Sequence, residues 1–138
     1  MNIAIIGYKN HARRLISIIN KLNVCSKLII FHPDKHKLIN GFNRDDLEFE
    51  IIFTNVIKDM FEASCIFIAT PTPTHYEYLV KILPIFKGYI FCEKPPCSSL
   101  EEVHNLSLLK RKDKERIYFN FNYRSTELAK LSKEAITN

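Results

Sequence analysis

A carboxylate, an amine and a proline end one apolar run of this sequence. Residues 90–92 read Ile-Phe-Cys, and Glu93, Lys94 and Pro95 follow directly. Because Pro95 has no backbone N–H and a fixed φ, an apolar strand must stop there. The proline also holds Lys94 in an extended conformation, which keeps its side chain away from a helix start. This arrangement predicts polar chemistry at the edge of a sheet.

A second stretch repeats the design. Residues 65–69 have the composition of a buried strand, and a polar turn from Thr70 to His75 follows at once. Thr74 and Glu77 fit a capping box that would start the next helix. Both polar turns follow apolar strands, and open α/β sheets bind ligands at the carboxyl ends of their strands. We therefore expect the two turns to share one site.

Taken alone, these residue types have simpler explanations. Lys94 fits an ordinary surface lysine beside a turn, and Glu93 fits a side chain that fixes the turn by hydrogen bonding. His75, at a helix start, fits a capping and packing role. The tyrosines at positions 76, 78 and 89 fit core and rim aromatics better than a base-stacking surface.

Apolar runs and helical spacing alternate along the whole chain. Runs typical of buried strands occupy residues 3–6, 28–31, 49–53, 65–69, 89–92 and 117–121. Helices are expected between the strands, in residues 10–22, 34–39, 56–61, 74–83 and 98–109, and a last one in residues 126–136 follows the final strand. Asn10 is the expected cap of the first helix, and Ser98 with Glu101 and Ser99 with Glu102 form two overlapping capping boxes before the fifth.

This alternation predicts an α/β fold, a doubly wound parallel six-stranded sheet with helices on both faces. A glycine turn after the first strand favours the strand order 3-2-1-4-5-6, with the switch point between strands one and four. The length of 138 residues suits a single domain.

The composition of the chain argues against a membrane span, a nucleic-acid groove and a zinc site. The longest uncharged run, which ends at Glu77, is interrupted by prolines and is too short to span a bilayer. The formal charge is +5, but acids interrupt the one dense basic run, Lys110 to Arg116, so a solvated helix end is favoured over a nucleic-acid groove. The four cysteines lack zinc-like spacing and indicate free thiols in a reducing cytoplasm.

In their order along the chain, these motifs resemble the N-terminal nucleotide-binding domain of the Gfo/Idh/MocA oxidoreductase family, which includes inositol and sugar dehydrogenases. The resemblance runs from Met1 to about Ile136. Its most specific parts are residues 68–75, Glu93-Lys94-Pro95 with the serine-started helix behind it, and Phe121-Asn-Tyr-Arg124.

The resemblance implies an NAD(P)-binding Rossmann domain over residues 1–124 and a terminal helix, residues 125–138, that leads towards an absent second domain. It implies that Lys94 contacts the cofactor ribose and the substrate near the transferred hydride, and makes Lys94 the catalytic residue. The implied cofactor-binding set is Gly7, Tyr8, Lys9, Asn10, His11, His32, Thr70, Pro71, Thr72, His75, Glu93, Lys94, Asn122 and Arg124.

Two residues depart from the family pattern. Lys9 replaces the middle glycine of the phosphate loop, which normally lets the backbone approach the pyrophosphate; the lysine brings both a charge and an obstructing Cβ. His32 stands where the family often has the acid that holds the adenosine ribose. With Lys35, His36 and Lys37 nearby, and Asp34 opposing them, His32 favours NADP over NAD.

The substrate domain of the family has no counterpart in the 138 residues. The chain is therefore either the nucleotide-binding part of an oxidoreductase acting on a sugar, polyol or related hydroxy compound, inactive alone, or a free-standing dinucleotide-binding or regulatory module. We expect the apolar surface around Phe121 and Tyr123 to be masked by self-association as a homodimer.

Overall fold

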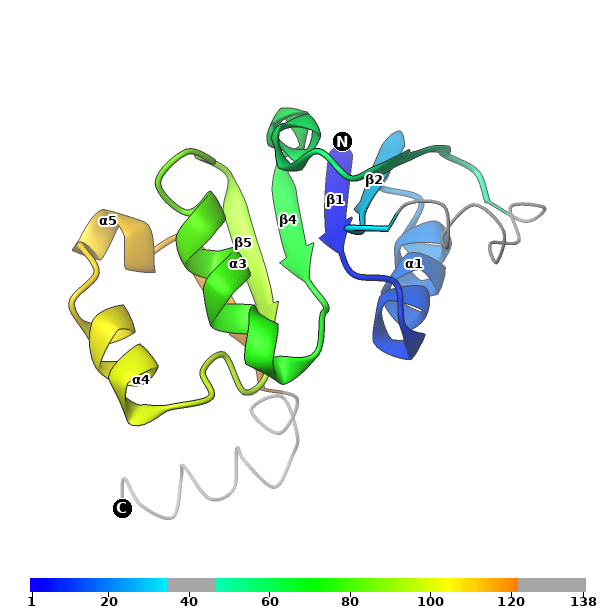
Figure 1. Ribbon diagram of the computed structural model, residues 1–138. Helices are drawn as coiled ribbons and strands as arrows, with labels where there is room; N and C mark the ends of the chain where they lie inside the picture. Colours follow the sequence, from blue (N-terminus) through cyan, green and yellow to red (C-terminus); the bar gives the residue numbers. More distant parts are fainter. Residues whose placement is uncertain (35–46, 122–138) are drawn as a thin grey trace, which may run out of the picture.

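Six parallel strands make up one sheet in the part of the chain that this computed structural model describes, residues 1–34 and 47–121. The strands are β1 Asn2–Ile6, β2 Lys27–Phe31, β3 Glu50–Thr54, β4 Cys65–Ile68, β5 Tyr89–Glu93 and β6 Ile117–Asn120. Their order is β3-β2-β1-β4-β5-β6 (Figure 1), which confirms the predicted topology. Each strand begins and ends within one residue of the predicted run.

The switch point of the sheet lies beside β1. Ile6, the last residue of β1, pairs with Phe31 of β2 on one side and with Ile68 of β4 on the other. From β2 and β3 the chain crosses back over the sheet to reach β4. The loops that leave β1, β2 and β4 therefore meet at one edge.

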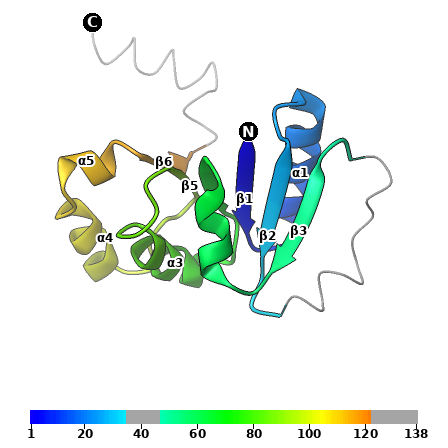
Figure 2. The same cartoon turned by 90° about the horizontal axis from the view of Figure 1, so that it is seen from above.

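Helices cover both faces of the sheet (Figure 2). The α-helices are α1 Asn10–Leu22, α3 His75–Ile82, α4 Leu100–Ser107 and α5 Arg111–Lys114, and short 3-10 helices span Ile57–Glu62 and Thr72–Thr74. α1 lies on one side of the sheet, and α3 and α4 lie on the other (Figure 2). The predicted helices over residues 34–39 and 126–136 fall almost wholly outside the described residues.

Two hydrophobic cores result, one on each face. Ala12, Ile16 and Ile19 of α1 pack on the strand residues that face them, whereas the opposite face buries residues such as Leu79 and Ile82 of α3. Strands buried on both sides need apolar residues at every position, which is why β1 and β2 read as continuous apolar runs. Each fully buried isoleucine or leucine contributes about 1.5–3 kcal/mol.

A row of aromatic rings crosses the α1 side of the sheet beyond α1. Phe67, Phe91 and Tyr118 stand opposite one another on β4, β5 and β6. Their ring centroids are 4.8 Å and 5.2 Å apart, with interplanar angles of 15° and 21°. Tyr118, at the end of the row, is 47% exposed. We call Phe67, Phe91 and Tyr118 the aromatic row.

Helix starts differ from the sequence-based expectations in detail. α1 is preceded by Lys9 as its N-cap, and no side chain caps it, so the expected Asn10 cap is wrong. Thr74 does precede α3, but its hydroxyl lies 2.9 Å from the Thr70 hydroxyl and 2.8 Å from the Pro71 carbonyl oxygen, so the expected capping box does not form. The preceding 3-10 turn draws that hydroxyl away from the helix.

The start of α4 is closer to the expectation. The Ser99 hydroxyl accepts a hydrogen bond from the Glu102 backbone N–H at 3.2 Å, as a capping box requires. The Glu102 carboxylate accepts from the backbone N–H of Ser98 at 2.6 Å rather than from that of Ser99. The helix ends at Ser107, before the expected Leu109, and the basic run forms the separate short helix α5.

The partly buried side chain of Arg116 connects the ends of three elements. Arg116, whose side chain is 12% exposed, donates to the carbonyl oxygens of Leu83 and Phe86 and pairs with Asp113 at 3.0 Å. These contacts join the end of α3, the turn before β5 and α5. A guanidinium with five donors suits this task because several acceptors converge on it.

We predict that Arg116→Met lowers the free energy of unfolding by about 2–4 kcal/mol, because buried carbonyls and the Asp113 carboxylate lose their donor. Arg111→Met is the matched control, since the Arg111 side chain is 93% exposed and its ion pair among the described residues is with the exposed Glu115. It should change the free energy by less than about 0.5 kcal/mol. Urea denaturation measures both; equal effects would contradict the assigned role of Arg116.

Candidate functional site

The turn after β1 requires glycine. Gly7 has φ +99°, and a Cβ at this position would lie 2.8 Å from the carbonyl oxygen of Ala69, the residue after β4. The Gly7 N–H donates to the carbonyl oxygen of Phe31 at 3.0 Å. The missing side chain therefore lets the turn pass between the ends of β2 and β4, and α1 starts three residues later.

The start of α1 suits an anion. No side chain caps it, and its first turn contains no acidic residue. Backbone N–H groups at a helix start and the helix dipole both favour negative charge. Lys9 adds a cation next to these groups.

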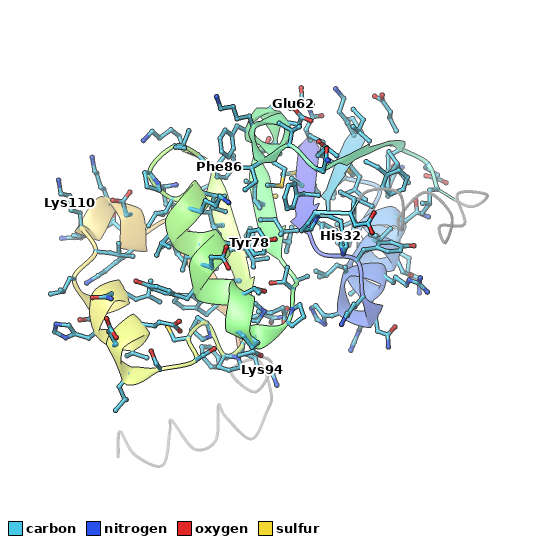
Figure 3. All side chains as sticks on the ribbon, in the orientation of Figure 1. His32, Glu62, Tyr78, Phe86, Lys94 and Lys110 are labelled. Atoms are coloured by element: carbon cyan, nitrogen blue, oxygen red, sulfur yellow. The ribbon has the colours of Figure 1, made fainter. Side chains whose placement is uncertain are left out.

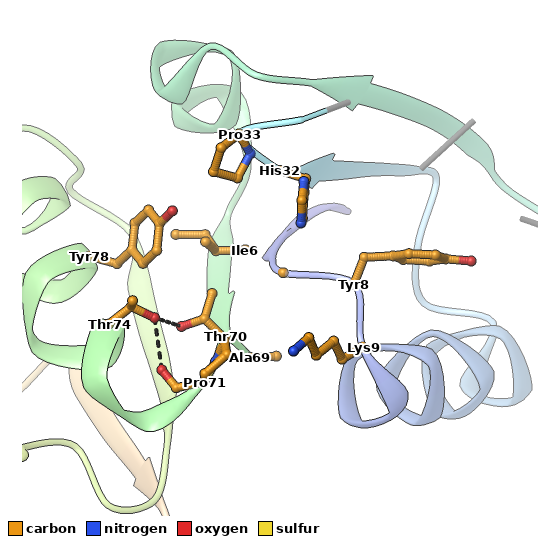
Figure 4. Close-up of a pocket in the computed structure, with 11 residues that line it drawn as sticks. Ile6, Tyr8, Lys9, His32, Pro33, Ala69, Thr70, Pro71, Thr74 and Tyr78 are labelled. Carbon is orange, nitrogen blue, oxygen red and sulfur yellow. Dashed lines mark hydrogen bonds between the residues drawn. The ribbon is translucent and has the colours of Figure 1, made fainter. Parts of the chain in front are cut away.

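A cavity of about 160 Å³ opens beside this turn. The loops after β1, β2 and β4 and the first turn of α3 line it (Figure 4). Lys9 extends its amine across the cavity towards Ala69 and Thr70, and the ring of His32 points into it from the opposite side (Figure 4). Tyr8 turns its ring outwards, where the Arg13 guanidinium lies 4.9 Å from the ring centroid.

His32 is held by the backbone that follows it. Its Nδ1 atom accepts a hydrogen bond from the Asp34 backbone N–H at 3.0 Å. This contact fixes the direction of the ring at the end of β2. At the position where the family often has an acid that holds the adenosine ribose, this chain thus has an imidazole.

His75 joins two loops. It is only 2% exposed, with Nε2 2.7 Å from the Thr70 carbonyl oxygen and Nδ1 2.8 Å from the Pro95 carbonyl oxygen. A neutral imidazole has one N–H, so it donates to only one of these oxygens at a time. The ring lies behind the cavity rather than in it, and its task is to position the loops after β4 and β5.

A polar cluster stands at the ends of β5 and β6. Glu93 and Asn120 are opposite each other in the sheet, and the Asn120 amide donates to Glu93 Oε1 at 2.6 Å. His11 Nε2, from the first turn of α1, also lies 2.6 Å from Glu93 Oε1. His11 Nε2 is buried and forms no hydrogen bond among the described residues, so the two side chains are close neighbours without a hydrogen bond between them. We call Glu93, His11 and Asn120 the Glu93 cluster.

Lys94 follows this cluster and is exposed. It lies at the carboxyl edge of the sheet, near the start of α3 (Figure 3), and its peptide bond to Pro95 is cis. The structure thus brings Gly7, Thr70 and Lys94 to one edge, as the sequence predicts.

The predicted site residues divide into three groups. Those that line the cavity are Gly7, Tyr8, Lys9, His32, Thr70 and Pro71. Those at the same edge but outside that cavity are Asn10, His11, Thr72, His75, Glu93 and Lys94. Asn122 and Arg124 lie outside the described residues, so their placement stays a prediction.

The sequence reasoning missed Thr74 and Tyr78, which also line the cavity. They are four residues apart at the start of α3, a spacing that places both on one helix face and could have revealed them. The Tyr78 ring meets that of Phe31 edge-on, with centroids 6.0 Å apart. Burial raises the pKa of the Tyr78 hydroxyl, which keeps it a neutral hydrogen-bonding group.

The pKa values of the cysteines are raised by burial, that of the half-buried Cys97 after β5 included. All four are free, and Cys25, Cys65 and Cys92 are buried. Loss of solvation raises the pKa of Cys92 to about 12 and that of Cys65 to about 11. Both therefore remain neutral thiols near neutral pH.

Comparison with known proteins agrees with this geometry. The sequence matches the oxidoreductase family with an NAD-binding Rossmann fold (GFO_IDH_MocA) over residues 1–121. No curated protein sequence matches the chain. The fold and the glycine turn define an NAD-binding Rossmann domain. The chain belongs to the Gfo/Idh/MocA oxidoreductase family.

Solved structures share the fold at low identity. Myo-inositol 2-dehydrogenase from Lactobacillus plantarum is 23% identical with a TM-score of 0.72, and all of this chain aligns with 41% of that one. WlbA dehydrogenase from Bordetella pertussis, in complex with NADH and UDP-GlcNAcA, is 17% identical with a TM-score of 0.72, covering 99% of this chain and 41% of that one. Apo scyllo-inositol dehydrogenase from Lactobacillus casei is 16% identical with a TM-score of 0.74, and the alignment covers 99% of this chain and 41% of that one. This chain thus spans about two fifths of these proteins.

We predict that His75→Leu destabilises the protein by about 2–4 kcal/mol, because the carbonyl oxygens of Thr70 and Pro95 lose the buried ring that bonds between them. His104→Leu, on the exposed side of α4, is the matched control and should cost less than about 0.5 kcal/mol. Urea unfolding of both variants tests this. A neutral effect of His75→Leu would show that the two loops do not depend on the ring.

Proposed function

We propose that this chain is the nucleotide-binding part of an NAD(P)-dependent oxidoreductase that acts on a sugar, polyol or related small hydroxy compound. The observation that carries the proposal is the cavity between the Gly7 turn and Thr70, at the same sheet edge as Lys94. Family membership supports the cofactor class. The names of the structural neighbours, inositol dehydrogenases and a dehydrogenase bound to UDP-GlcNAcA, support the substrate class.

In this proposal, the two halves of the bound dinucleotide lie on either side of the start of α1. Its adenosine half occupies the cavity at the ends of β1, β2 and β4, and its pyrophosphate lies at the uncapped helix start beside Lys9. The nicotinamide half then extends towards β5, and the resemblance implies that Asn122 and Arg124, outside the described residues, border it. His32 takes the place of a ribose-binding acid, so a 2′-phosphate is tolerated and NADP is favoured.

Lys94 is the proposed catalytic residue. When bound, the cofactor supplies the hydride acceptor or donor. The exposed amine of Lys94 would hold the cofactor ribose and the substrate hydroxyl group near the position of transfer. The loop Thr70-Pro71-Thr72 borders the dinucleotide, and His75 positions that loop against the turn at Pro95.

The alternative is a free-standing dinucleotide-binding or regulatory module without catalysis. The chain spans about two fifths of the dehydrogenases that share its fold, which is compatible with both proposals. The length of the native reading frame separates the two, because a substrate domain after residue 138 would identify the enzyme.

A cytoplasmic location and small-molecule partners complete the proposal. No helix among the described residues is long and apolar enough to cross a membrane. The basic run lies largely on α5, where Arg111 pairs with Glu115 and Arg116 pairs with Asp113. Paired and solvated charges of this kind support a solvated surface rather than a phosphate-binding groove.

We expect calorimetric titration to show binding of NAD(H) and NADP(H), with NADP(H) several-fold tighter. Lys9→Met should weaken binding about five- to tenfold, more visibly at low salt, because the amine extends across the cavity towards the proposed pyrophosphate position. Lys9→Gly should weaken binding similarly if the charge matters more than the obstruction.

Lys112→Met, on exposed α5, is the matched control for the loss of one charge and should leave affinity unchanged. Tighter binding by Lys9→Gly would show instead that the side chain obstructs the cofactor. Absence of binding by every form at millimolar ligand would reject the dinucleotide site.

This chain alone should not turn over polyols or sugars with NAD(P). Holding donor and acceptor in reacting geometry contributes roughly 7–11 kcal/mol to such a step, and one wall of the site cannot supply it. Reduction of NAD(P) with a panel of polyols and sugars tests the expectation. Steady turnover by a monomer would show that the active site lies elsewhere.

We also expect the 138-residue chain to self-associate as a homodimer. Tyr89, Tyr118 and Phe121 are 55%, 47% and 44% exposed, and exposed aromatic surface of this kind favours burial against another surface. Light scattering over a range of concentrations measures the mass. A strict monomer at every concentration would contradict the expectation.

A further inference from the structure

The Glu93 cluster places a shielded negative charge on one side of the Gly7 turn. The Glu93 side chain is 16% exposed, and its Oε1 atom is engaged by the Asn120 amide and lies beside His11. The hydrogen bond from Asn120 thus holds the carboxylate in one direction instead of letting it turn into solvent, and His11 lies beside it.

The position of this charge relative to the proposed cofactor follows from the strand order. The cavity proposed for the adenosine half lies between the ends of β2, β1 and β4. Glu93 ends β5, whose backbone lies two strands, roughly 10 Å, from that of β1, beyond β4. Its carboxylate reaches back to His11 in the first turn of α1. A dinucleotide whose pyrophosphate lies at the start of α1 must extend its other half in this direction, over the ends of β4 and β5.

The two oxidation states of that half differ in charge. The oxidised nicotinamide ring is a cation, and the reduced ring is neutral. A nearby carboxylate in a partly shielded site therefore attracts the oxidised ring and is indifferent to the reduced one. The groups next to this carboxylate that can oppose it are His11 when protonated and Lys94, whereas Cys92 is a neutral thiol and Asn120 carries no charge.

We propose that Glu93 sets the oxidation-state preference of the cofactor site, and that Asn120 is the residue that positions its carboxylate. This rests on the proposed dinucleotide site and adds to it a discrimination between two forms of one ligand. The free energy of the oxidised complex falls relative to that of the reduced complex. As a result the domain binds the oxidised cofactor, which accepts hydride, more tightly than the reduced cofactor.

The test is the ratio of dissociation constants for NADH and NAD⁺, measured by calorimetry at one pH and ionic strength. Glu93→Gln keeps the shape and the Oε1 acceptor of the side chain but removes its charge. We expect it to lower the ratio about five- to tenfold, chiefly by weakening NAD⁺. Glu101→Gln, an exposed carboxylate in the first turn of α4, removes the same charge elsewhere and should leave the ratio unchanged.

ADP-ribose, which lacks the nicotinamide ring, separates a local effect from a damaged fold. Its affinity should not fall in Glu93→Gln, and any effect of the lost charge on the pyrophosphate beside α1 cancels in the NADH to NAD⁺ ratio. Asn120→Ala, which frees the carboxylate to turn, should lower the NADH to NAD⁺ ratio by a smaller factor. An unchanged ratio in Glu93→Gln, or an equal loss of ADP-ribose affinity, would overturn the role of Glu93. Failure of wild type to bind ADP-ribose would reject the dinucleotide site itself, and this inference with it.

Discussion

The close approach of the Gly7 turn to the carbonyl of Ala69 is the constraint on which the cofactor edge depends. Parallel pairing on both sides of β1 brings the ends of β2 and β4 against this turn, and only a residue without a side chain passes between them at φ +99°. Because the turn is so tight, α1 begins with its uncapped end directed at the switch point. Loops from both halves of the sheet can then line one cavity.

Much of this arrangement is readable from the sequence because it depends on local composition. Strands buried on both faces must be apolar throughout, so their limits are visible within one residue. The alternation of strand and helix, with glycine after the first strand, gives the topology. The residues that end strands, Thr70 and Lys94 among them, then follow from the rule that parallel strands present their carboxyl ends at one edge.

What the sequence could not show depends on contacts between distant residues. Thr74 looked like a helix cap, yet a hydroxyl can also bond to the preceding turn, and the 3-10 turn at Thr72 decides between the two. The pairing of Glu93 with Asn120 needs the register of β5 on β6, which no local pattern records. His11 reaches Glu93 from another element altogether, so its neighbour is visible only in three dimensions.

The imidazole of His75 acts as a mechanical link between segments that are 25 residues apart, the carbonyl of Thr70 and that of Pro95. Packing holds the ring in place, so it cannot follow either loop outwards. If one loop moves, its contact with the ring is lost unless the helix start moves too. The cavity wall at Thr70 and the backbone next to Lys94 are therefore held against one fixed point, and a shift of either loop costs its contact with the ring.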